Sequence, residues 1–351
     1  MKFKIGRNDI GDNSPVFIIA EMSGNHGGSL EEAVKIVRAA KEAGADAVKL
    51  QTYTADTITL NSDKADFKLP SNNPWSNHSN LYQLFQKAFT PWEWHPILFE
   101  EAKQCGVEIF SSPFDLSAVD FLEKLKAPAY KIASPEITDV GLIEKVARTK
   151  KPVILSTGAA ELNDIELAVK TIQEAGCDSF AFLKCVASYP SPPEAMNLKT
   201  IPHLAEMFNC VSGLSDHSLG IGIPVAAVAL GAKLIEKHFV LNKKDTVDGF
   251  FSLDKESFTQ MVIEIRKVEK AIGKVSYQID EEGKKNFWGR RSLYFSDTIK
   301  KDDVISENNI RSVRPSFGLH PKFKKEILGK KALENHELGD RIHAKDIDWD
   351  S

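Results

Sequence analysis

The sequence predicts an α/β protein, a TIM (β/α)8 barrel followed by a small C-terminal domain. Eight short apolar runs recur between residues 16 and 239, and helical patterns lie between them, which is the rhythm of βα units. The chain has no glycine-rich dinucleotide fingerprint, which favours a barrel over the doubly wound open sheet that shares this rhythm. Its 351 residues suffice for one large and one small domain.

The predicted strands are short and mostly apolar, as expected of strands buried in a parallel sheet. The first is VFIIAE at 16–21, and the second is AVKLQ at 47–51. The other six have the same character: EIFSSP (108–113), AYKIAS (129–134), VILSTG (153–158), FAFLKCV (180–186), VSGLSD (211–216) and LIEKHF (234–239).

The first predicted helix covers 29–44, between the first two strands. Ser29 is a candidate N-cap, Glu32 is its partner in a capping box, and Gly44 is a stop signal. Apolar residues recur at helical spacing between these ends. Further helices are predicted near 92–104, 116–125, 139–149, 161–175, 197–208 and 220–230, with a last one at 254–272.

One connection breaks the rhythm. Between Gln51 and Pro91 the sequence shows little periodicity, and the stretch 61–80 is strongly polar. Loops of this length are uncommon in compact domains and are usually functional or disordered. Because this one follows the carboxyl end of a barrel strand, a lid over the site is preferred to a decorative surface loop.

The composition shifts after Lys274 from helical patterns to a polar stretch and then to short strand-like runs. The predicted domains are therefore a barrel at 1–275, a linker at 276–289 and a small domain at 290–351. A domain of about 60 residues buries little core of its own. We expect it to dock on a barrel, either in its own chain or in a partner's.

The composition excludes several classes of protein. Apolar content of 42% and charged content of 27% are ordinary for a soluble globular chain, and the net charge of −4 argues against nucleic acid or an anionic membrane as a partner. We find no apolar run of membrane-spanning length and expect no signal peptide. The four cysteines are scattered without a CxxC pair, which suits a cytoplasmic protein and argues against a structural zinc site.

Two histidines end consecutive predicted strands. Ser215 and His217 share one face of the first strand, and Glu236 and His238 share one face of the second. Neighbouring parallel strands lie ~4.8 Å apart, so both imidazoles can reach one metal ion at the carboxyl ends. The alternative is that each histidine caps its strand or hydrogen-bonds in the core. Lys237 alternates with the histidines, so we interpret it as structural.

Two lysines lie inside apolar strand runs, where an unpaired charge is costly. Lys49 and Lys131 both point into the barrel mouth by alternation, which favours a binding site for phosphate or carboxylate. The alternative is a structural ion pair with a barrel carboxylate such as Glu21 or Glu236, and both interpretations can hold at once.

Other polar residues follow the predicted strands at the same edge, where the active sites of TIM barrels lie. They are Glu21, Gln51, Ser134, Glu136, Ser156, Thr157, Lys184, Ser188, Tyr189, Ser215, Asp216 and Glu236. Two histidines leave metal positions open for water and a substrate carbonyl, although they do not identify the metal. Beside an anion site, this arrangement suits the addition of a carbon nucleophile to an aldehyde.

Eight motifs occur in order along the chain: EMSGNHGGSL, AVKLQTYTADT, TPWEWH, FSSPFD, YKIAS, ILSTG, GLSDHS and EKHF. Together they resemble the sialic acid synthase family, and most closely its pseudaminic acid synthase branch. Each motif alone is weak, whereas eight in order at strand ends are specific. The resemblance covers nearly the whole chain, and the C-terminal domain resembles the family's antifreeze-like (SAF, β-clip) domain.

The resemblance implies a transferase that forms a C–C bond between phosphoenolpyruvate and an N-acylated amino sugar in its open-chain aldehyde form. The expected sugar is a bis-acetamido trideoxy hexose, and the products are a nine-carbon keto acid of the pseudaminic acid type and phosphate. The resemblance also implies a divalent metal, Mn²⁺ with Mg²⁺ or Co²⁺ as alternatives. It further implies a homodimer in which the C-terminal domain caps the partner's barrel.

The same resemblance assigns roles to individual residues. His217 and His238 hold the metal. The residues that bind phosphoenolpyruvate are Lys49, Lys131, Ser134 and Ser156, with Ser215 as a further substrate contact. The sugar contacts are Gln51, Tyr189 and Asp248. Glu136 is the base for the sugar hydroxyl, and Glu21 acts on the water that attacks the pyruvyl carbon. Arg314 is the residue that the swapped domain inserts towards the N-acyl group.

Several positions depart from the family's pattern. Val186 and Ala187 replace a common polar pair, Val240 replaces a common threonine, and Pro135 separates Ser134 from Glu136. The first departure bears on sugar specificity and makes a spore-coat polysaccharide member of the family the nearest alternative. N-acetylneuraminate and legionaminate synthases are further family alternatives. Outside that chemistry, a catalytically silent sugar-binding barrel and a metal-dependent aldolase or isomerase remain open.

Overall fold

The computed structural model describes residues 2–71, 73–244 and 246–351. The chain divides into two compact units, Met1–Gly273 and Lys274–Ser351. The stretch predicted as a linker, 276–289, lies in the second unit and contains α11 (Glu281–Lys285) and η5 (Phe287–Gly289). The predicted division into barrel, linker and small domain stays a prediction.

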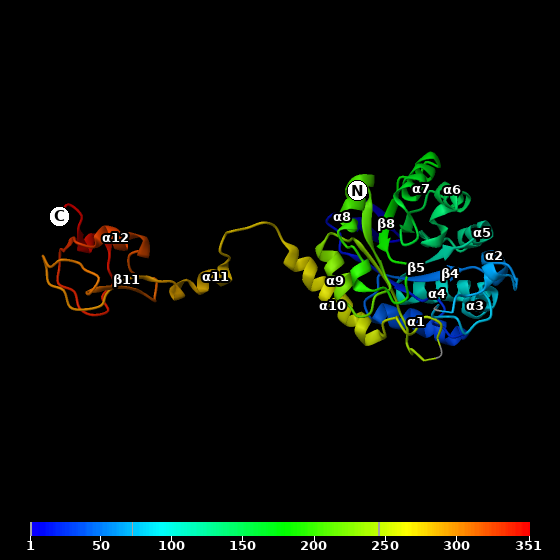
Figure 1. Ribbon diagram of the computed structural model, residues 1–351, viewed down its shortest axis with the longest axis horizontal. Helices are drawn as coiled ribbons and strands as arrows, with labels where there is room; N and C mark the ends of the chain where they lie inside the picture. The colour runs from blue at the N-terminus through cyan, green and yellow to red at the C-terminus, as the bar shows by residue number, and fades with distance from the viewer. Residues whose placement is uncertain (1, 72, 245) are drawn as a thin grey trace. The chain divides into compact units, whose positions relative to one another are not determined.

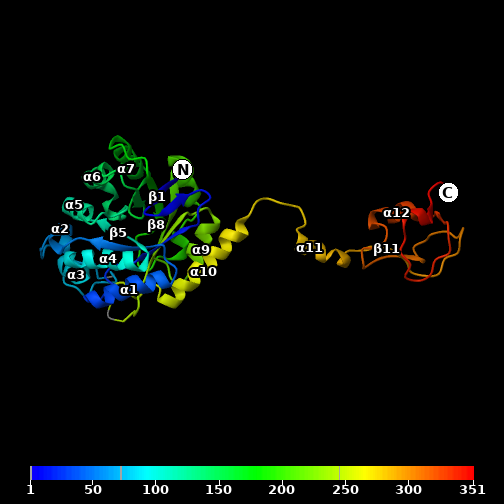
Figure 2. The same ribbon diagram turned by 180° about the vertical axis from the view of Figure 1, so that it is seen from behind.

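The first unit contains a closed barrel of eight parallel strands in the order β10-β3-β4-β5-β6-β7-β8-β9. The strands are β3 (Phe17–Glu21), β4 (Ala47–Thr52), β5 (Glu108–Pro113), β6 (Tyr130–Ile132), β7 (Val153–Ser156), β8 (Phe180–Cys185), β9 (Val211–Asp216) and β10 (Leu234–His238). Each coincides with a predicted strand, so the predicted TIM barrel is confirmed. Figure 1 shows the helices around it, and Figure 2 shows the same arrangement from behind.

Helices follow the strands at the predicted places. They are α1 (Leu30–Glu42), α4 (His95–Cys105), α5 (Leu116–Lys124), α6 (Val140–Arg148), α7 (Leu162–Glu174), α8 (Thr200–Phe208), α9 (Gly222–Ala229) and α10 (Lys255–Ile272). Ser29 Oγ accepts from the Glu32 backbone N at 3.3 Å, and Gly44 ends the turn after α1 at a φ of +93°. In the described part of the chain, no helix combines the length and apolar character needed to cross a membrane.

An N-terminal hairpin closes the other end of the barrel. Strands β1 (Lys2–Ile5) and β2 (Asn8–Gly11) pair antiparallel. Phe3, Ile5 and Ile10 join the cluster of side chains inside the barrel, so the hairpin covers its amino-terminal end. We did not predict this hairpin from the sequence, although KFKI alternates polar and apolar residues and precedes a turn.

The long connection after β4 has more structure than its sequence indicates. It contains α2 (Ala55–Ile58), η1 (Ala65–Phe67) and α3 (Leu81–Ala88), which begins at Asn80 as N-cap. Leu84 of α3 is buried, and several side chains of this segment line the cavity described below. The segment therefore lies against the barrel mouth, as the prediction of a cover requires.

The second unit has a small core and short strands, as the sequence predicts. Strands β11 (Ser292–Phe295) and β12 (Ile310–Val313) pair antiparallel, and so do β13 (Lys331–Ala332) and β14 (Ile347–Asp348). One short helix, α12 (Lys324–Ile327), packs with them. The core is mostly isoleucine: Leu293, Phe295, Ile299, Ile305, Ile310, Ile327, Ala332, Ile342 and Ile347.

Short 3-10 turns in both units complete the chain: η2 (Trp92–Trp94), η3 (Pro135–Thr138), η4 (Pro193–Ala195), η6 (Pro321–Phe323) and η7 (Ala344–Asp346).

Candidate active site

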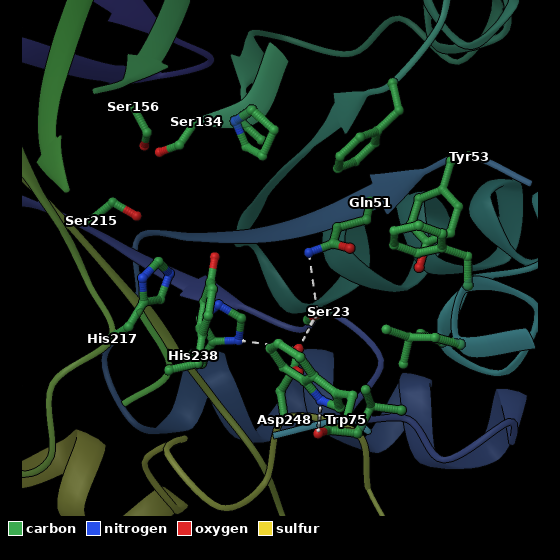
Figure 3. Close-up of a pocket in the computed structure, with 18 of the residues that line it drawn as sticks. Ser23, Gln51, Tyr53, Trp75, Ser134, Ser156, Ser215, His217, His238 and Asp248 are labelled. Atoms are coloured by element: carbon green, nitrogen blue, oxygen red, sulfur yellow. Dashed lines mark hydrogen bonds and ion pairs between the residues drawn. The ribbon is translucent and has the colours of Figure 1, made fainter. Parts of the chain in front are cut away.

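A cavity of about 310 Å³ opens at the carboxyl ends of the barrel strands. Most of the predicted site residues line it: Lys49, Gln51, Lys131, Ser134, Ser156, Tyr189, Ser215, His217, His238 and Asp248. Figure 3 shows Ser134, Ser156 and Ser215 at one side of this cavity, with Trp75 and Tyr53 towards the other. Glu21 and Glu136 are not part of its lining, and Arg314 belongs to the second unit.

Strand register brings the charged residues of the site together. Glu21 of β3 pairs with Lys49 of β4 and with His238 of β10, while Ser215 of β9 pairs with Glu236 of β10. Neighbouring strands of a parallel sheet lie ~4.8 Å apart, so side chains on one face at paired positions come into contact. Alternation along the strands was therefore enough to predict the inward face.

Two lysines and two glutamates form a buried charge cluster beside the cavity. Lys49 Nζ lies 2.5 Å from Glu21 Oε2 and 3.7 Å from Glu236 Oε1, and Lys131 Nζ lies 3.8 Å from Glu236 Oε1. All four side chains are at most 5% exposed, so each charge depends on the others. The predicted structural ion pairs are present, and both lysines also line the cavity.

The pKa values of this cluster reflect the balance between burial and pairing. Burial lowers the pKa of Lys131, and Glu236 offsets this only in part. Burial alone would raise the pKa of Glu236, but Lys131 and Lys49, together with His217 and the Ser215 hydroxyl, hold that pKa below its usual value. Glu236 therefore stays ionised between two cations. Both lysines line the cavity together with Glu236, so an anion bound there would lie beside two ammonium groups.

The two histidines face each other at the ends of β9 and β10. Their ring centroids are 5.2 Å apart, and both side chains are almost fully buried. His217 Nδ1 lies 3.0 Å from the Val186 carbonyl, which orients the ring and leaves Nε2 free of that contact. His238 Nδ1 is buried without a hydrogen bond from any described residue, 3.6 Å from Asp248 Oδ2.

Lys237 confirms the alternation argument from the other face of β10. Its Nζ lies 2.5 Å from Asp216 Oδ2, and neither residue is part of the cavity lining. Lys237 is thus a structural cation, as we predicted.

Glu136 lies just behind the cavity, in the turn η3 that follows β6. Pro135 occupies the first position of that turn and is itself part of the lining. Burial raises the pKa of Glu136 to about 7, and Lys131 offsets this only in part. Its Oε2 is buried and has no hydrogen-bond partner among the described residues. A carboxyl group in this state can exchange a proton near neutral pH.

Sequence reasoning missed Ser23, which lies two residues after β3 and lines the cavity. Gln51 Nε2 donates to Ser23 Oγ at 3.1 Å, and Ser23 Oγ donates to Asp248 Oδ2 at 2.5 Å, as the dashed lines in Figure 3 show. Burial raises the pKa of Asp248 to about 6. Ser23 belongs to the motif EMSGNHGGSL, but it lies in the loop after β3, where strand alternation no longer predicts the direction of a side chain.

An aromatic wall forms the far side of the cavity; sequence reasoning predicted one of its residues, Tyr189, and missed the other, Trp75. Trp75, from the long connection after β4, donates from Nε1 to the Val247 carbonyl at 2.9 Å. Its ring centroid lies 5.3 Å from that of Tyr189, which is in turn 4.4 Å from that of His217. Leu84 and other apolar side chains of the same connection continue the wall. The cavity therefore has a polar, charged end and an apolar end.

Comparison with known proteins identifies the family. Residues 36–277 match the NeuB family, and residues 290–348 match the SAF domain. The chain belongs to the NeuB family. The second match agrees with the predicted antifreeze-like domain, and the first covers most of the barrel that carries the cavity.

Other members of the NeuB family are similar over nearly their whole length. Pseudaminic acid synthase of Campylobacter jejuni subsp. jejuni serotype O:23/36 (strain 81-176) is 49% identical over 95% of this chain and 96% of its own. Pseudaminic acid synthase of Helicobacter pylori (strain ATCC 700392 / 26695) is 45% identical over 95% and 98%. The crystal structure of spore coat polysaccharide biosynthesis protein SpsE of Bacillus subtilis superposes with a TM-score of 0.68, at 36% identity, over 100% of both chains.

The departures from the NeuB-family pattern lie beside the site. Val186 contributes its backbone carbonyl to His217, a contact that does not depend on the Val186 side chain. Val240 is fully buried, and its backbone N donates to the Leu253 carbonyl. Val240 is not part of the cavity lining.

Proposed function

We propose that this NeuB-family protein is a synthase of the pseudaminic acid type. It condenses phosphoenolpyruvate with a bis-acetamido trideoxy hexose in its open-chain aldehyde form. The methylene carbon of phosphoenolpyruvate bonds to the aldehyde carbon, water adds to the pyruvyl carbon, and inorganic phosphate leaves, giving a nine-carbon keto acid. The observation that carries this proposal is that a buried lysine pair and two facing imidazoles line the same cavity.

The polar end of the cavity suits phosphoenolpyruvate. Lys49 and Lys131 supply positive charge that water does not screen, and Ser134 and Ser156 supply hydroxyl donors. Ser215 Oγ donates to Glu236 Oε1 at 3.1 Å, so its hydroxyl can only accept from a ligand. Ser156 Oγ is buried without a hydrogen-bond partner among the described residues, so it is free to donate to a ligand. Two hydroxyl donors and two ammonium groups match the oxygen-rich surface of a phosphate and a carboxylate.

The rest of the cavity suits the sugar. Gln51 and Asp248 present polar atoms to it, and Tyr189 forms part of the aromatic wall. Glu136 accepts the proton of a sugar hydroxyl, which its pKa of about 7 permits. Glu21 acts on the attacking water, although its carboxylate reaches the cavity only through its contacts with Lys49 and Gln51. The apolar wall matches the methyl groups of a deoxygenated, acetylated sugar.

The two histidines fit a divalent metal, which we propose to be Mn²⁺, with Mg²⁺ or Co²⁺ as alternatives. The buried Nδ1 of His238, which has no hydrogen bond from a described residue, and the oriented ring of His217 are the observations that support this fit. Among the described residues no three ligating side chains cluster. Two histidine ligands would leave positions for water and substrate. When bound there, the metal supplies Lewis-acid polarisation of the sugar aldehyde.

Phosphate release tests the proposed function. We expect phosphate only when phosphoenolpyruvate and an amino sugar are both present, with the bis-acetamido trideoxy hexoses preferred over mono-acetamido hexoses. A catalytically silent sugar-binding barrel would bind sugars and release none. A metal-dependent aldolase or isomerase would turn over sugars without phosphoenolpyruvate.

The spore-coat alternative rests on one observation, the Val186 and Ala187 pair after β8. Against it stands sequence similarity: SpsE of Bacillus subtilis is 38% identical, compared with 49% for the Campylobacter jejuni pseudaminic acid synthase. The sugar panel separates the two functions because they differ in the preferred sugar.

The proposed substrate phosphoenolpyruvate is made in the cytoplasm, so the proposal places the protein there.

We also propose a homodimer in which the C-terminal domain acts on the partner's barrel, with Arg314 reaching the N-acyl group of the sugar. The support is the resemblance to the family. A guanidinium donates readily to an acyl carbonyl.

Mixing two inactive variants tests this arrangement. One variant carries Arg314→Ala and the other carries His217→Ala. If the domain acts in trans, mixed dimers regain one site in which both wild-type groups meet, and part of the activity returns. With subunit exchange verified by mass spectrometry, no recovery would contradict the swapped dimer.

A further inference from the structure

Ser23 has a backbone conformation that serine adopts only with strain. Its φ is +47°, in the left-handed region that glycine adopts freely and that residues with a Cβ disfavour. A glycine at this position would adopt the same φ without the penalty of a Cβ. Strained positions of this kind persist where the side chain is needed. The side chain of Ser23 is 6% exposed and lines the cavity.

The hydroxyl of Ser23 joins two of the proposed sugar contacts. Ser23 Oγ accepts from Gln51 Nε2 and donates to Asp248 Oδ2. A hydroxyl has one donor and two acceptor positions, so both hydrogen bonds form at once and in one direction only. The Ser23–Asp248 hydrogen bond also links the loop after β3 to the loop after β10, which lie 225 positions apart in the sequence.

The amide of Gln51 is oriented by the same contacts. Its Nε2 also donates to Glu21 Oε1 at 2.9 Å, and an ionised carboxylate can only accept. Both amide hydrogens are therefore used, by Glu21 and by Ser23. No hydrogen bond from a described residue reaches Gln51 Oε1 or Asp248 Oδ1. Two acceptor oxygens are thus left for a ligand in the cavity.

We infer that Ser23 is a positioning residue that sets Gln51 and Asp248 as a pair of acceptors for the sugar. The inference rests on the proposed function and deepens it, because it states what the sugar must offer. Two acceptors require two donors, so the substrate presents a hydroxyl and an acylamino N–H, or two N–H groups, to this side of the cavity. Phosphoenolpyruvate has no donor when ionised, so this pair selects for the sugar alone.

Ser23→Gly separates the role of the hydroxyl from that of the backbone. Glycine removes the hydroxyl and also relieves the strained φ, so a purely structural role predicts an equal or better protein. We expect the KM for the sugar to rise roughly 10- to 100-fold, as for loss of hydrogen bonds to a charged group. The KM for phosphoenolpyruvate should stay within about twofold, and the melting temperature should not fall.

Two further variants complete the test. Ser23→Ala also deletes the hydroxyl but keeps the strain, so it should raise the sugar KM equally while melting below Ser23→Gly. Asn209→Gly is the matched control, because Asn209 has a φ of +44° at the end of α8, outside the proposed site. It should melt at an equal or higher temperature and leave both KM values unchanged.

An unchanged sugar KM in Ser23→Gly would overturn the inference, and so would an equal loss of affinity for both substrates. Failure of the proposed function looks different, because the wild type would then release no phosphate with any sugar. In that case crystal structures of the wild type and Ser23→Gly decide without substrate. A reoriented Gln51 amide or Asp248 carboxylate supports the inference, and unchanged side chains refute it.

Discussion

His217→Ala or His238→Ala is expected to lower phosphate release by about three orders of magnitude and to remove its dependence on a divalent metal. The reason is that Lewis-acid polarisation of a carbonyl contributes several kcal/mol to the transition state. Each variant keeps only one imidazole of the facing pair, whose ring centroids lie 5.2 Å apart. Deleting a side chain at the cavity edge leaves the barrel strands themselves intact.

Three measurements check this prediction. Phosphate release is followed against metal concentration, with and without chelator, and Mn²⁺ binding is measured directly by electron paramagnetic resonance. Circular dichroism shows that the fold is kept. His203→Ala is the control, since His203 is exposed on α8 and should behave as wild type. Full turnover in either site variant, unaffected by chelator, would refute the metal role.

Lys131→Met is expected to weaken phosphoenolpyruvate binding and to destabilise the barrel at the same time. It removes a charge-assisted contact worth roughly 1.5–3 kcal/mol, so phosphoenolpyruvate affinity should fall about tenfold or more. It also leaves the buried cluster with one cation for the two carboxylates Glu21 and Glu236. Breaking a buried pair in this way costs about 3–5 kcal/mol of stability.

A second substitution separates the two effects. Lys131→Met combined with Glu236→Gln restores the charge balance, so the free energy of unfolding should recover in large part while phosphoenolpyruvate affinity stays low. Lys237→Met is the matched control, because it breaks an equally buried pair with Asp216 outside the cavity. It should lose stability and keep its affinity.

Urea unfolding and isothermal titration with phosphoenolpyruvate supply the two readouts. Wild-type affinity in Lys131→Met would exclude Lys131 from the anion site. Affinity that returned in the double variant would mean that the single substitution had acted through misfolding rather than through a lost contact.

Regular elements were predictable from the sequence because a parallel barrel gives each strand the same environment. Strands such as β4 and β9 are buried on both faces and read as apolar runs, while capped amphipathic helices such as α1 lie between them. The N-terminal hairpin was missed because it is short and mostly polar, and its apolar residues are stabilised only by the barrel interior that it covers. Local pattern carries no information about such a partner.

The candidate site also divides into residues on strands, which were predictable, and residues on loops, which were not. Lys49, Lys131 and the two histidines lie on strands, where alternation states the face, and the structure brings all four to one cavity. Ser23 and Trp75 reach it from loops, through hydrogen bonds to Asp248 and Val247 far along the chain. A loop side chain has no period, so only the folded chain identifies it. The role of Arg314 stays a prediction.

The most direct test of the proposed function is the stoichiometry of one reaction. The protein is incubated with phosphoenolpyruvate, a bis-acetamido trideoxy hexose and Mn²⁺, and both phosphate and nine-carbon keto acid are quantified. We predict equimolar amounts of the two products, and neither product when one substrate is omitted. Phosphate without keto acid, or a new sugar product formed without phosphoenolpyruvate, would contradict the proposed condensation.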